Sequence, residues 1–514
     1  MTFFRLSQLG GFLASTLILT ACGGSSSDNK EELTWVQGEF APYSTFAGQC
    51  EASNSNFALN EKLWLRSWSN DTYLWYDEII DTDPTPYSVL EYFDLLKTTE
   101  LSPTGNLKDQ FHFSMPTSEW EALNQSGASV GYGFNIYLQQ ASATTDRQVT
   151  ITYSEPNSPA TDASIERGAI IVSIDGVSVK DANDSDSIAI LNNGLFPDED
   201  GQQTLFGILD LGATQVRNVT LTAQTVTSTP VQNVKTLSTT SGNVGYMQFN
   251  SHIATAERGL FDAITSLKNT GVSDLVLDLR YNGGGLLAMA SQMAYMVAGS
   301  QATQNKIFEL STFNDKYPTT NPVTGETLSP MPFYNSTLGF NTSLLSSGQA
   351  LPTLDLKRVY VLTTDDTCSA SEAIINSLRG IDIEVIQLGS TTCGKPYGFY
   401  PTPNCGETYF SVQFRGENNK GFGDYSDGFM PSQSPTLESE IQGCQLSDDF
   451  EHALGDPNER LLSAALYYRD NASCPAGTRS IAKMPTQTQF VDQGFILQDT
   501  RMQTVLKNSR ILSQ

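Results

Sequence analysis

The sequence predicts a multi-domain protein of the mixed α/β class with a largely parallel sheet at its core. The chain has 514 residues, enough for roughly three domains, and 39% of them are hydrophobic, enough to build cores. Beyond residue 229, short apolar segments alternate with helical patterns, which is typical of βαβ units. Residues 126–228 show short strand patterns and turn signals instead. We therefore expect an α/β core beside a smaller β-rich domain.

The charge of the chain excludes one broad class of function. Asp and Glu number 56 against 29 Lys and Arg, which gives a formal net charge of −27. Such a chain cannot hold nucleic acid or anionic lipid through a broad electrostatic surface. We expect a solvated acidic surface and no nucleic-acid partner.

Residues 1–21 have the pattern of an export signal. A positive charge at Arg5 is followed by an apolar run over residues 9–20, which is shorter than the about 20 apolar residues that span a bilayer. The segment 19–22 ends in Cys22 and resembles the lipobox of bacterial lipoproteins. This resemblance implies cleavage before Cys22 and lipid attachment to it. The alternative is an ordinary signal peptide that contains a cysteine.

The residues after Cys22 indicate a tether. Gly and Ser fill positions 23–27, and we place the tether at residues 22–49. Residue 23 is Gly rather than Asp, which by resemblance to proteobacterial lipoproteins favours the outer membrane of a Gram-negative bacterium. The sequence thus predicts a lipid-anchored protein of the cell envelope, held at the bilayer through Cys22.

Six further cysteines predict disulfides, because their number is even and the chain has an export signal. They are Cys50, Cys368, Cys393, Cys405, Cys444 and Cys474. Six cysteines allow 15 connectivities. We expect Cys393 and Cys405, which flank a short Pro/Gly-rich stretch, to form one pair. With three His and no CxxC pair, we expect no zinc site and no other cofactor.

Residues 50–125 are predicted to form an N-terminal helical subdomain. Trp64, Trp68 and Trp75 stand at i, i+4 and i+11, which places them near one face of a helix. An aromatic stripe of this kind is typical of a core. After a break at residues 83–86, a second helix is expected over residues 87–96.

The β-rich region over residues 126–228 contains specific local signals. A strand is expected at 149–153, and a short helix at residue 159 with Ser158 as its N-cap. Asp175-Gly176 between two apolar segments predicts a hairpin.

Upstream of these elements lies the tetrapeptide Gly131-Tyr132-Gly133-Phe134. Such a loop can direct backbone N–H groups into one concavity, while the next strand pairs with a peptide. The region resembles a PDZ domain, which implies that these four residues bind peptide. A β-rich module without a ligand is the alternative.

Three predicted strands of the core at residues 229–474 each end in residues that can carry chemistry. The strands at 274–280, 359–363 and 384–389 lead into a triple glycine, Ser369 and Lys395. Carboxyl ends of parallel strands share one edge of a sheet, so we expect these segments to meet. A serine needs a base to become a nucleophile, and a lysine can serve if burial lowers its pKa.

The segments 278–285, 367–372 and 389–395 are similar to the three signatures of the carboxyl-terminal processing, or tail-specific, peptidases. The resemblance covers roughly residues 126–470 and implies a PDZ domain joined to a crotonase-like protease core. It implies that Ser369 is the nucleophile and Lys395 the general base. It also implies an oxyanion hole formed by the N–H groups of Ala370 and Gly284, with Gly285 as a neighbouring candidate. Residues 475–514 are expected to be a C-terminal tail.

The resemblance predicts an exported, lipid-anchored serine endopeptidase that cleaves protein substrates near their free C-termini through an acyl-enzyme. One departure is Phe399, where many relatives place a Gln that orients the lysine. The third member of the site is therefore left unassigned, and a catalytically silent peptide-binding scaffold is the main alternative. A hydrolase of small esters or amides, and a triad of Ser369 with His252 or His452, are further alternatives.

Overall fold

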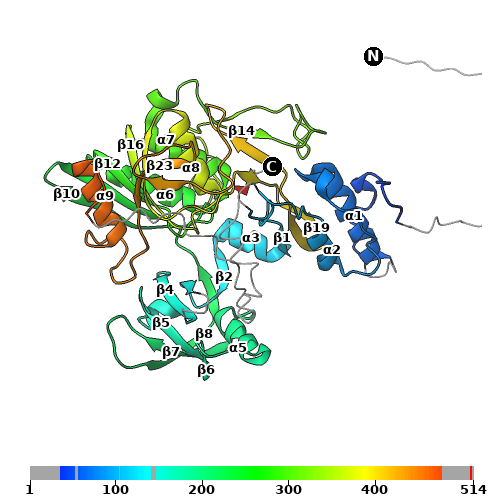
Figure 1. Cartoon of the computed structure of the whole chain (residues 1–514), viewed down its shortest axis with the longest axis horizontal. Helices are drawn as coiled ribbons and strands as arrows, with labels where there is room; N and C mark the ends of the chain where they lie inside the picture. Colours follow the sequence, from blue (N-terminus) through cyan, green and yellow to red (C-terminus); the bar gives the residue numbers. More distant parts are fainter. Residues whose placement is uncertain (1–34, 52–55, 103–104, 140–145, 477–509, 512–514) are drawn as a thin grey trace, which may run out of the picture.

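The structure is a computed structural model that describes residues 35–51, 56–102, 105–139, 146–476 and 510–511. The predicted signal peptide, Cys22 and nearly all of the predicted tail lie outside the described residues. An α/β body carries N-terminal helices at one side and a β-rich domain that projects from it (Figure 1). The mixed α/β class with several sheets is confirmed. Within the described part of the chain, no helix has the length and apolarity needed to cross a membrane.

The N-terminal region contains short helices packed around aromatic side chains. They are η1 Tyr43–Thr45, α1 Phe57–Thr72, η2 Tyr76–Glu78 and α2 Val89–Leu95. Trp64 and Trp68 stack with ring centroids 5.3 Å apart and are buried, as predicted. The prediction for Trp75 is wrong, because α1 ends at Thr72 and Trp75 lies in the following turn. Its ring packs against Tyr397, 4.8 Å away.

Residues 113–126 pack against the α/β core rather than with α1 and α2. They form β1 Phe113–Pro116, which pairs with β20 Glu407–Phe410, and α3 Thr117–Ser126. Phe113 and Trp120 belong to the main core cluster. The helical pattern expected here therefore fails at β1, whose partner strand lies almost 300 residues further along the chain.

The β-rich domain has the predicted local elements. Its sheet contains β3 Phe134–Gln139, β4 Gln148–Ser154, β5 Ile170–Ile174, β6 Val177–Ser178, β7 Gln203–Leu209 and β8 Arg217–Thr222, with helices α4 Pro159–Asp162 and α5 Ser185–Leu195. The β5–β6 hairpin turns at Asp175-Gly176, where both residues have positive φ, and Ser158 caps α4. The domain is joined to the core by β2 Ala128–Gly131 and β9 Gln224–Thr227, which pair antiparallel.

The core sheet has the order β10-β11-β12-β16-β17-β23-β22. Its strands are β10 Val231–Thr239, β11 Gly242–Phe249, β12 Asp274–Asp278, β16 Arg358–Thr363, β17 Glu384–Gly389, β22 Met430–Ser432 and β23 Glu440–Gln445. All neighbours are parallel except β10 with β11. The predicted βαβ arrangement is therefore confirmed, and the carboxyl ends of β12, β16 and β17 share one edge.

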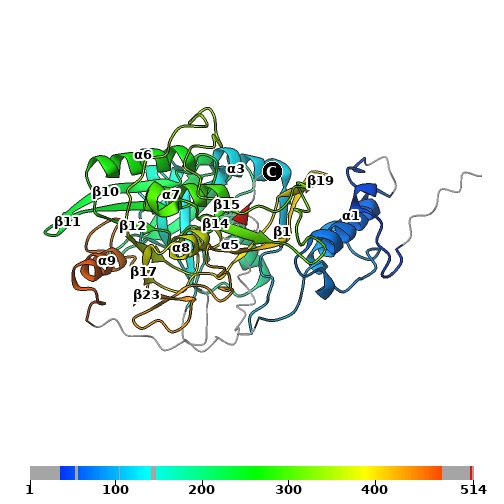
Figure 2. The same ribbon diagram turned by 90° about the horizontal axis from the view of Figure 1, so that it is seen from above.

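Helices cover both faces of this sheet. They are α6 Ala256–Asn269, α7 Leu287–Thr303, α8 Ala370–Gly380 and α9 Arg460–Asn471. The first three contribute to the main core cluster on one face, and α9 packs on the other (Figure 2). The remaining short strands belong to small sheets outside the core sheet: β13 Gly285–Leu286, β14 Ile307–Thr312, β15 Met331–Pro332, β18 Tyr397–Gly398, β19 Thr402–Asn404, β21 Phe414–Glu417 and β24 Arg510–Ile511.

The cysteines form disulfides, as predicted, but in a different pairing. The bonds are Cys50–Cys405, Cys368–Cys393 and Cys444–Cys474. The predicted Cys393–Cys405 pair is wrong. Cys405 lies at the turn between β19 and β20 and faces the N-terminal region, whereas Cys393 lies in the loop after β17 beside Cys368.

Candidate active site

The three segments that follow β12, β16 and β17 are cross-linked by backbone hydrogen bonds. The carbonyl oxygen of Asn282 accepts from Cys368 N at 3.0 Å and from Ser371 Oγ at 2.9 Å. Cys393 N in turn donates to the carbonyl of Thr367 at 3.1 Å. The predicted meeting of these segments at one sheet edge is therefore confirmed.

Ser369 lies at the tight turn between β16 and α8. Its φ of 59° is unusual for a residue with a side chain, and such strain persists only where the surroundings hold it. Its side chain is fully buried, and among the described residues Oγ has no hydrogen-bond partner. A strained strand-to-helix turn that presents an unpartnered hydroxyl is a geometry suited to a nucleophile.

Lys395 is fully buried between aromatic rings. Its Nζ lies 4.2 Å from the ring centroid of Phe399 and 4.8 Å from that of Phe111. Burial lowers the pKa of Lys395 well below its usual 10.5, although the nearby carboxylates of Asp109 and Glu372 act in the opposite direction. A lysine in such an apolar pocket can act as a base, because its neutral form is favoured.

Glu372 connects the two sides of the site. Its Oε2 accepts from the backbone N–H of Ser369 at 2.9 Å and from that of Lys395 at 2.8 Å, so both backbones are held by one oxygen. Its Oε1 accepts from Gly394 N at 2.9 Å and from Thr392 Oγ1 at 2.5 Å. Burial raises the pKa of Glu372, and these hydrogen bonds oppose the rise.

Glu372 is a site residue that the sequence motifs did not identify, although a signal was present. Ser369 followed three residues later by Glu372 has the spacing of a capping box. In that motif the acidic side chain reaches back to the N-cap N–H, as the Ser369 N–H bond to Glu372 does here.

The glycine loop, residues 282–285 after β12, contains Gly284 and Gly285, the predicted donors to an oxyanion. The N–H of Gly284 donates to Asn282 Oδ1 at 3.0 Å, so an oxyanion would have to replace that acceptor. Gly285 has a φ of 132°, and a Cβ there would lie 2.5 Å from the carbonyl oxygen of His252, so only glycine fits. Ala370 is the first residue of α8, where backbone N–H groups have no partner within the helix. The oxyanion roles of Ala370 and Gly284, with Gly285 as the neighbouring candidate, therefore stay predictions.

Neither histidine of the alternative triad hydrogen-bonds Ser369 Oγ, which has no such partner among the described residues. His252 Nδ1 faces Asn282 Oδ1 at 3.0 Å, and burial lowers the pKa of His252 to about 4. His452 Nδ1 faces Asp449 at 2.8 Å. A triad requires the base to hydrogen-bond the hydroxyl, so this geometry does not support one.

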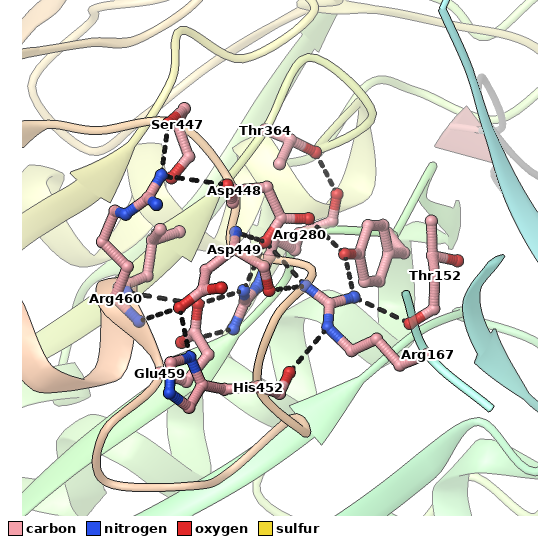
Figure 3. A network of polar contacts seen from close by, with 12 residues as sticks. Thr152, Arg167, Arg280, Thr364, Ser447, Asp448, Asp449, His452, Glu459 and Arg460 are labelled. Carbon is pink, nitrogen blue, oxygen red and sulfur yellow. Dashed lines mark hydrogen bonds and ion pairs between the residues drawn. The ribbon is translucent and has the colours of Figure 1, made fainter. Parts of the chain in front are cut away.

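A buried polar network joins the glycine loop to the β-rich domain (Figure 3). Arg280 bonds Asp278, Asp448 and Glu459. From the β-rich domain, Arg167 donates to Tyr281 Oη at 2.6 Å and to Asp448 Oδ1 at 2.8 Å. The same guanidinium donates to the carbonyls of residues 152, 449 and 452.

The electrostatics of this network stabilise its charged form. Burial alone would raise the pKa of Asp448, but Arg280 and Arg167 outweigh it and hold the pKa at about 2. Because Tyr281 also donates to Asp448 and directly precedes Asn282, the position of the β-rich domain is coupled to the glycine loop.

We expect Arg167→Ala to lower the free energy of unfolding by about 2–4 kcal/mol, because it leaves buried acceptors without their donor. Arg167→Lys should not restore stability, because a single ammonium group cannot reach all of the acceptors that the guanidinium contacts. Urea denaturation measures both. Arg217→Ala is the control: its ion pair with Asp210 is in the same domain but about one third exposed, and should cost under about 1 kcal/mol. Equal losses for the two alanine variants would contradict the prediction.

A cavity of about 530 Å³ lies between the β-rich domain and the core. Its lining includes all four predicted peptide-binding residues, Gly131, Tyr132, Gly133 and Phe134, together with Asn250, Ser251 and Tyr281 of the core. The ring of Tyr132 is buried, and its hydroxyl donates to Thr204 at 2.7 Å, so this side chain supports the cavity wall.

Glu155 also lines this cavity, and burial raises its pKa to about 7. Hydrogen bonds from Thr229 N and Gln232 Nε2 lower the pKa but do not outweigh burial. Ionising it therefore costs stability as pH rises from its usual pKa of 4.5 to the folded value. We expect Glu155→Gln to raise the free energy of unfolding by about 1–2 kcal/mol at pH 8 and to change it little at pH 4. Urea denaturation at the two pH values tests this, and a gain that does not depend on pH would contradict it.

One cluster among the described residues has the composition of a metal site. It contains Cys368, Cys393 and Glu372. The two sulfur atoms are bonded to each other, and the carboxylate accepts backbone N–H groups. The sulfur atoms and the carboxylate of this cluster are therefore already used in bonds that hold the site together, and they do not form a metal site.

Residues 243–402 match the family model described as Peptidase family S41. The matched segment contains the glycine loop, Ser369 and Lys395. The chain carries a peptidase family S41 domain.

Curated relatives of the S41 domain are named as processing proteases. The C-terminal processing peptidase, chloroplastic, of Tetradesmus obliquus is 30% identical over 205 residues, 37% of this chain and 42% of the relative. Carboxy-terminal processing protease CtpA of Bacillus subtilis is 27% identical over 189 residues, 37% of this chain and 38% of the relative. The chain spans about two fifths of the length of these relatives.

One solved structure extends the likeness in fold beyond the matched segment. A Bacteroides fragilis protein described as an S41 protease superposes with a TM-score of 0.57 at 23% identity, covering 80% of this chain and 97% of that one. The mixed α/β fold is therefore that of S41 proteases.

Proposed function

We propose that this protein is a serine endopeptidase that cleaves protein substrates near their C-termini, with Ser369 as nucleophile and Lys395 as general base. The observation that carries the proposal is the shared acceptor of the two backbones, Glu372 Oε2, which brings an unpartnered hydroxyl and a buried lysine to one edge of the sheet. A hydroxyl and a neutral amine in a site that excludes water can perform acyl transfer without a histidine.

In the proposed reaction, Lys395 removes the proton from Ser369 Oγ as the oxygen attacks the carbonyl carbon of the scissile bond. The oxyanion of the tetrahedral intermediate is stabilised by N–H groups at the start of α8 and in the glycine loop. The lysine then returns the proton to the leaving amine, and the C–N bond breaks. Water, deprotonated by the same lysine, hydrolyses the ester and frees Ser369.

Two features support a peptide as the substrate. The cavity beside Gly131–Phe134 can take a free C-terminus through backbone N–H groups, in the manner of strand-adding peptide sites. At the active-site edge, Arg510–Ile511 pairs in parallel with Gly285–Leu286, so this edge accepts an added strand. A substrate strand bound there would lie next to the glycine loop.

Digestion of a denatured protein with wild type, Ser369→Ala and Lys395→Ala tests the proposal. Mass spectrometry should find fragments lacking the C-terminal part of the substrate with wild type but with neither Ser369→Ala nor Lys395→Ala. Ser377→Ala is the control, because Ser377 lies on the same helix and bonds only within it. Equal cleavage by wild type and Ser369→Ala would refute the proposed nucleophile, and turnover of small esters without cleavage of long chains would favour the small-molecule hydrolase.

A silent peptide-binding scaffold is the second candidate, because Phe399 stands against Lys395 where many relatives have a Gln. An aromatic ring cannot accept or donate the hydrogen bond by which an amide would orient the amine. Peptide binding by wild type without any cleavage would favour the scaffold.

We further propose that the mature protein begins at Cys22 and is held by lipid in the outer membrane. The apolar run before Cys22 and the Gly/Ser segment after it support this. Metabolic labelling with a fatty acid should mark the wild type but not Cys22→Ser. Membrane fractionation then reports which membrane holds it, and an unlabelled wild type would refute the anchor.

A further inference from the structure

The disulfide Cys368–Cys393 joins the two segments that carry the proposed nucleophile and base. Cys368 directly precedes Ser369, and Cys393 lies two residues before Lys395. The Cα atoms of the two cysteines are 5.2 Å apart, and only 25 positions separate them along the chain. Cys368 is fully buried whereas Cys393 is partly exposed, so the bond reaches the surface of the site.

We propose that Cys368 and Cys393 are positioning residues of the active site, which fix Ser369 and Lys395 relative to each other through a covalent bond. This inference rests on the proposed function. Beyond that function, the placement of Ser369 relative to Lys395 depends on this disulfide, in addition to any contribution of the bond to global stability.

The rest of the contact between the two segments is non-covalent. Cys393 N donates to Thr367 O at 3.1 Å, and Glu372 holds the backbones of Ser369 and Lys395. Ser369 has a strained φ of 59°, and a strained residue relaxes when its surroundings loosen. A displacement of about 1 Å between reacting groups can cost about 100-fold in rate, so a firm link has catalytic value.

The bond also keeps Lys395 away from water. The lysine follows Cys393 in a loop that runs over Glu372 and leads to Phe399. If this loop detaches from the Ser369 turn, water enters the pocket and the ammonium form becomes less costly. Loss of the bond should therefore both slow the reaction and shift its pH dependence to higher pH.

The disulfide Cys444–Cys474 offers a matched control. It closes a segment of 30 positions, close to the 25 of Cys368–Cys393, so the two bonds should constrain the unfolded chain to a similar extent. Cys444 and Cys474 pack in the cluster on the α9 face, opposite α8. The control thus separates global stabilisation from positioning.

We would compare wild type, Cys368→Ala/Cys393→Ala and Cys444→Ala/Cys474→Ala for peptide cleavage across pH and for thermal unfolding. Both double variants should unfold at lower temperature. At 25 °C only Cys368→Ala/Cys393→Ala should lower kcat, by about 10- to 100-fold. Only in this variant should the acid limb of the pH profile of kcat move to higher pH. Equal kcat and equal acid limbs in the two variants would overturn the inference.

Hydrogen exchange followed by mass spectrometry gives a readout that does not need turnover. Peptides covering residues 364–372 and 391–398 should exchange faster in Cys368→Ala/Cys393→Ala than in the control, and unchanged exchange would overturn the inference. If oxidised wild type cleaves nothing while exchange still differs, the proposed function fails and the positioning by the bond stands. If the variant does not fold, mild reduction of wild type, with alkylation of Cys368 and Cys393 verified by mass, supplies the same comparison.

Discussion

Replacing Lys395 with Met is expected to lower kcat by about 10²–10⁴-fold with the fold retained, the range typical of losing a general base. Methionine keeps an unbranched apolar chain in the pocket of Phe111 and Phe399 but has no amine to accept the proton of Ser369. Lys395→Arg should not restore activity, because a guanidinium stays protonated. Steady-state cleavage of a peptide with a free C-terminus measures the effect.

The pH dependence of the wild type follows from the same residue. Burial lowers the pKa of Lys395 well below 10.5, and only the neutral amine can act as base. Activity should therefore rise with pH through the folded pKa and reach its plateau well below 10.5. The same shift lowers the free energy of unfolding as pH falls from 10.5 to the folded pKa, because over this range the unfolded chain binds a proton that the folded chain does not, and Lys395→Met should remove that fall.

Lys62→Met is the matched control for this variant. Lys62 is also buried, and its amine donates to the carbonyls of Pro84 and Tyr87 in the N-terminal region. The substitution should lower thermal stability and leave kcat within about twofold, because nothing of the proposed dyad contacts it. A similar loss of kcat in both variants would mean that Lys395 acts through stability alone.

Replacing Glu372 with Gln is the second change with a large expected effect. The two carboxylate oxygens of Glu372 accept four hydrogen bonds. In glutamine an NH₂ group replaces one of these oxygens, so a donor would face other donors. We expect the free energy of unfolding to fall by about 2–4 kcal/mol and kcat to fall by about 10- to 100-fold, since both Ser369 and Lys395 lose their shared acceptor.

Glu257→Gln controls for the general cost of such a change. Glu257 is buried and accepts from the backbone N–H groups of Leu338, Gly339 and Phe340, none of which belongs to the segments that carry Ser369 and Lys395. Its substitution should cost comparable stability in urea denaturation without lowering kcat at 25 °C. If both glutamine variants retain full kcat, Glu372 does not position the dyad.

Local sequence patterns predict many of the helices and strands of this protein, because the interactions that determine these elements join residues close in sequence. Continuous apolar runs identified β12, β16 and β17, and the rule for carboxyl ends of parallel strands predicted that the segments of Ser369 and Lys395 would meet. Glu372 was recoverable from the spacing of a capping box, but its second role toward Lys395 depends on how the loop after β17 folds back.

The errors arise where distant segments meet. Cys393 and Cys405 are near in sequence, yet each finds its partner across the fold, and spacing alone cannot distinguish such pairings. The strand at Phe113–Pro116 exists because β20 offers it an edge, which no local pattern reveals. The spacing of Trp75 from Trp64 and Trp68 fits a helical period only by coincidence, because α1 ends at Thr72.

The paired strands β2 and β9 have a practical consequence for the architecture. Because Gly131 stands opposite Gln224, the β-rich domain leaves and re-enters the core at neighbouring points. A short turn linking Gly131 to Gln224 would therefore close a hairpin and keep the path of the remaining chain. Because this deletion also removes Arg167, it would leave Tyr281 and Asp448 without this donor, so the shortened chain would keep its path but lose the buried contacts that the domain makes with the core.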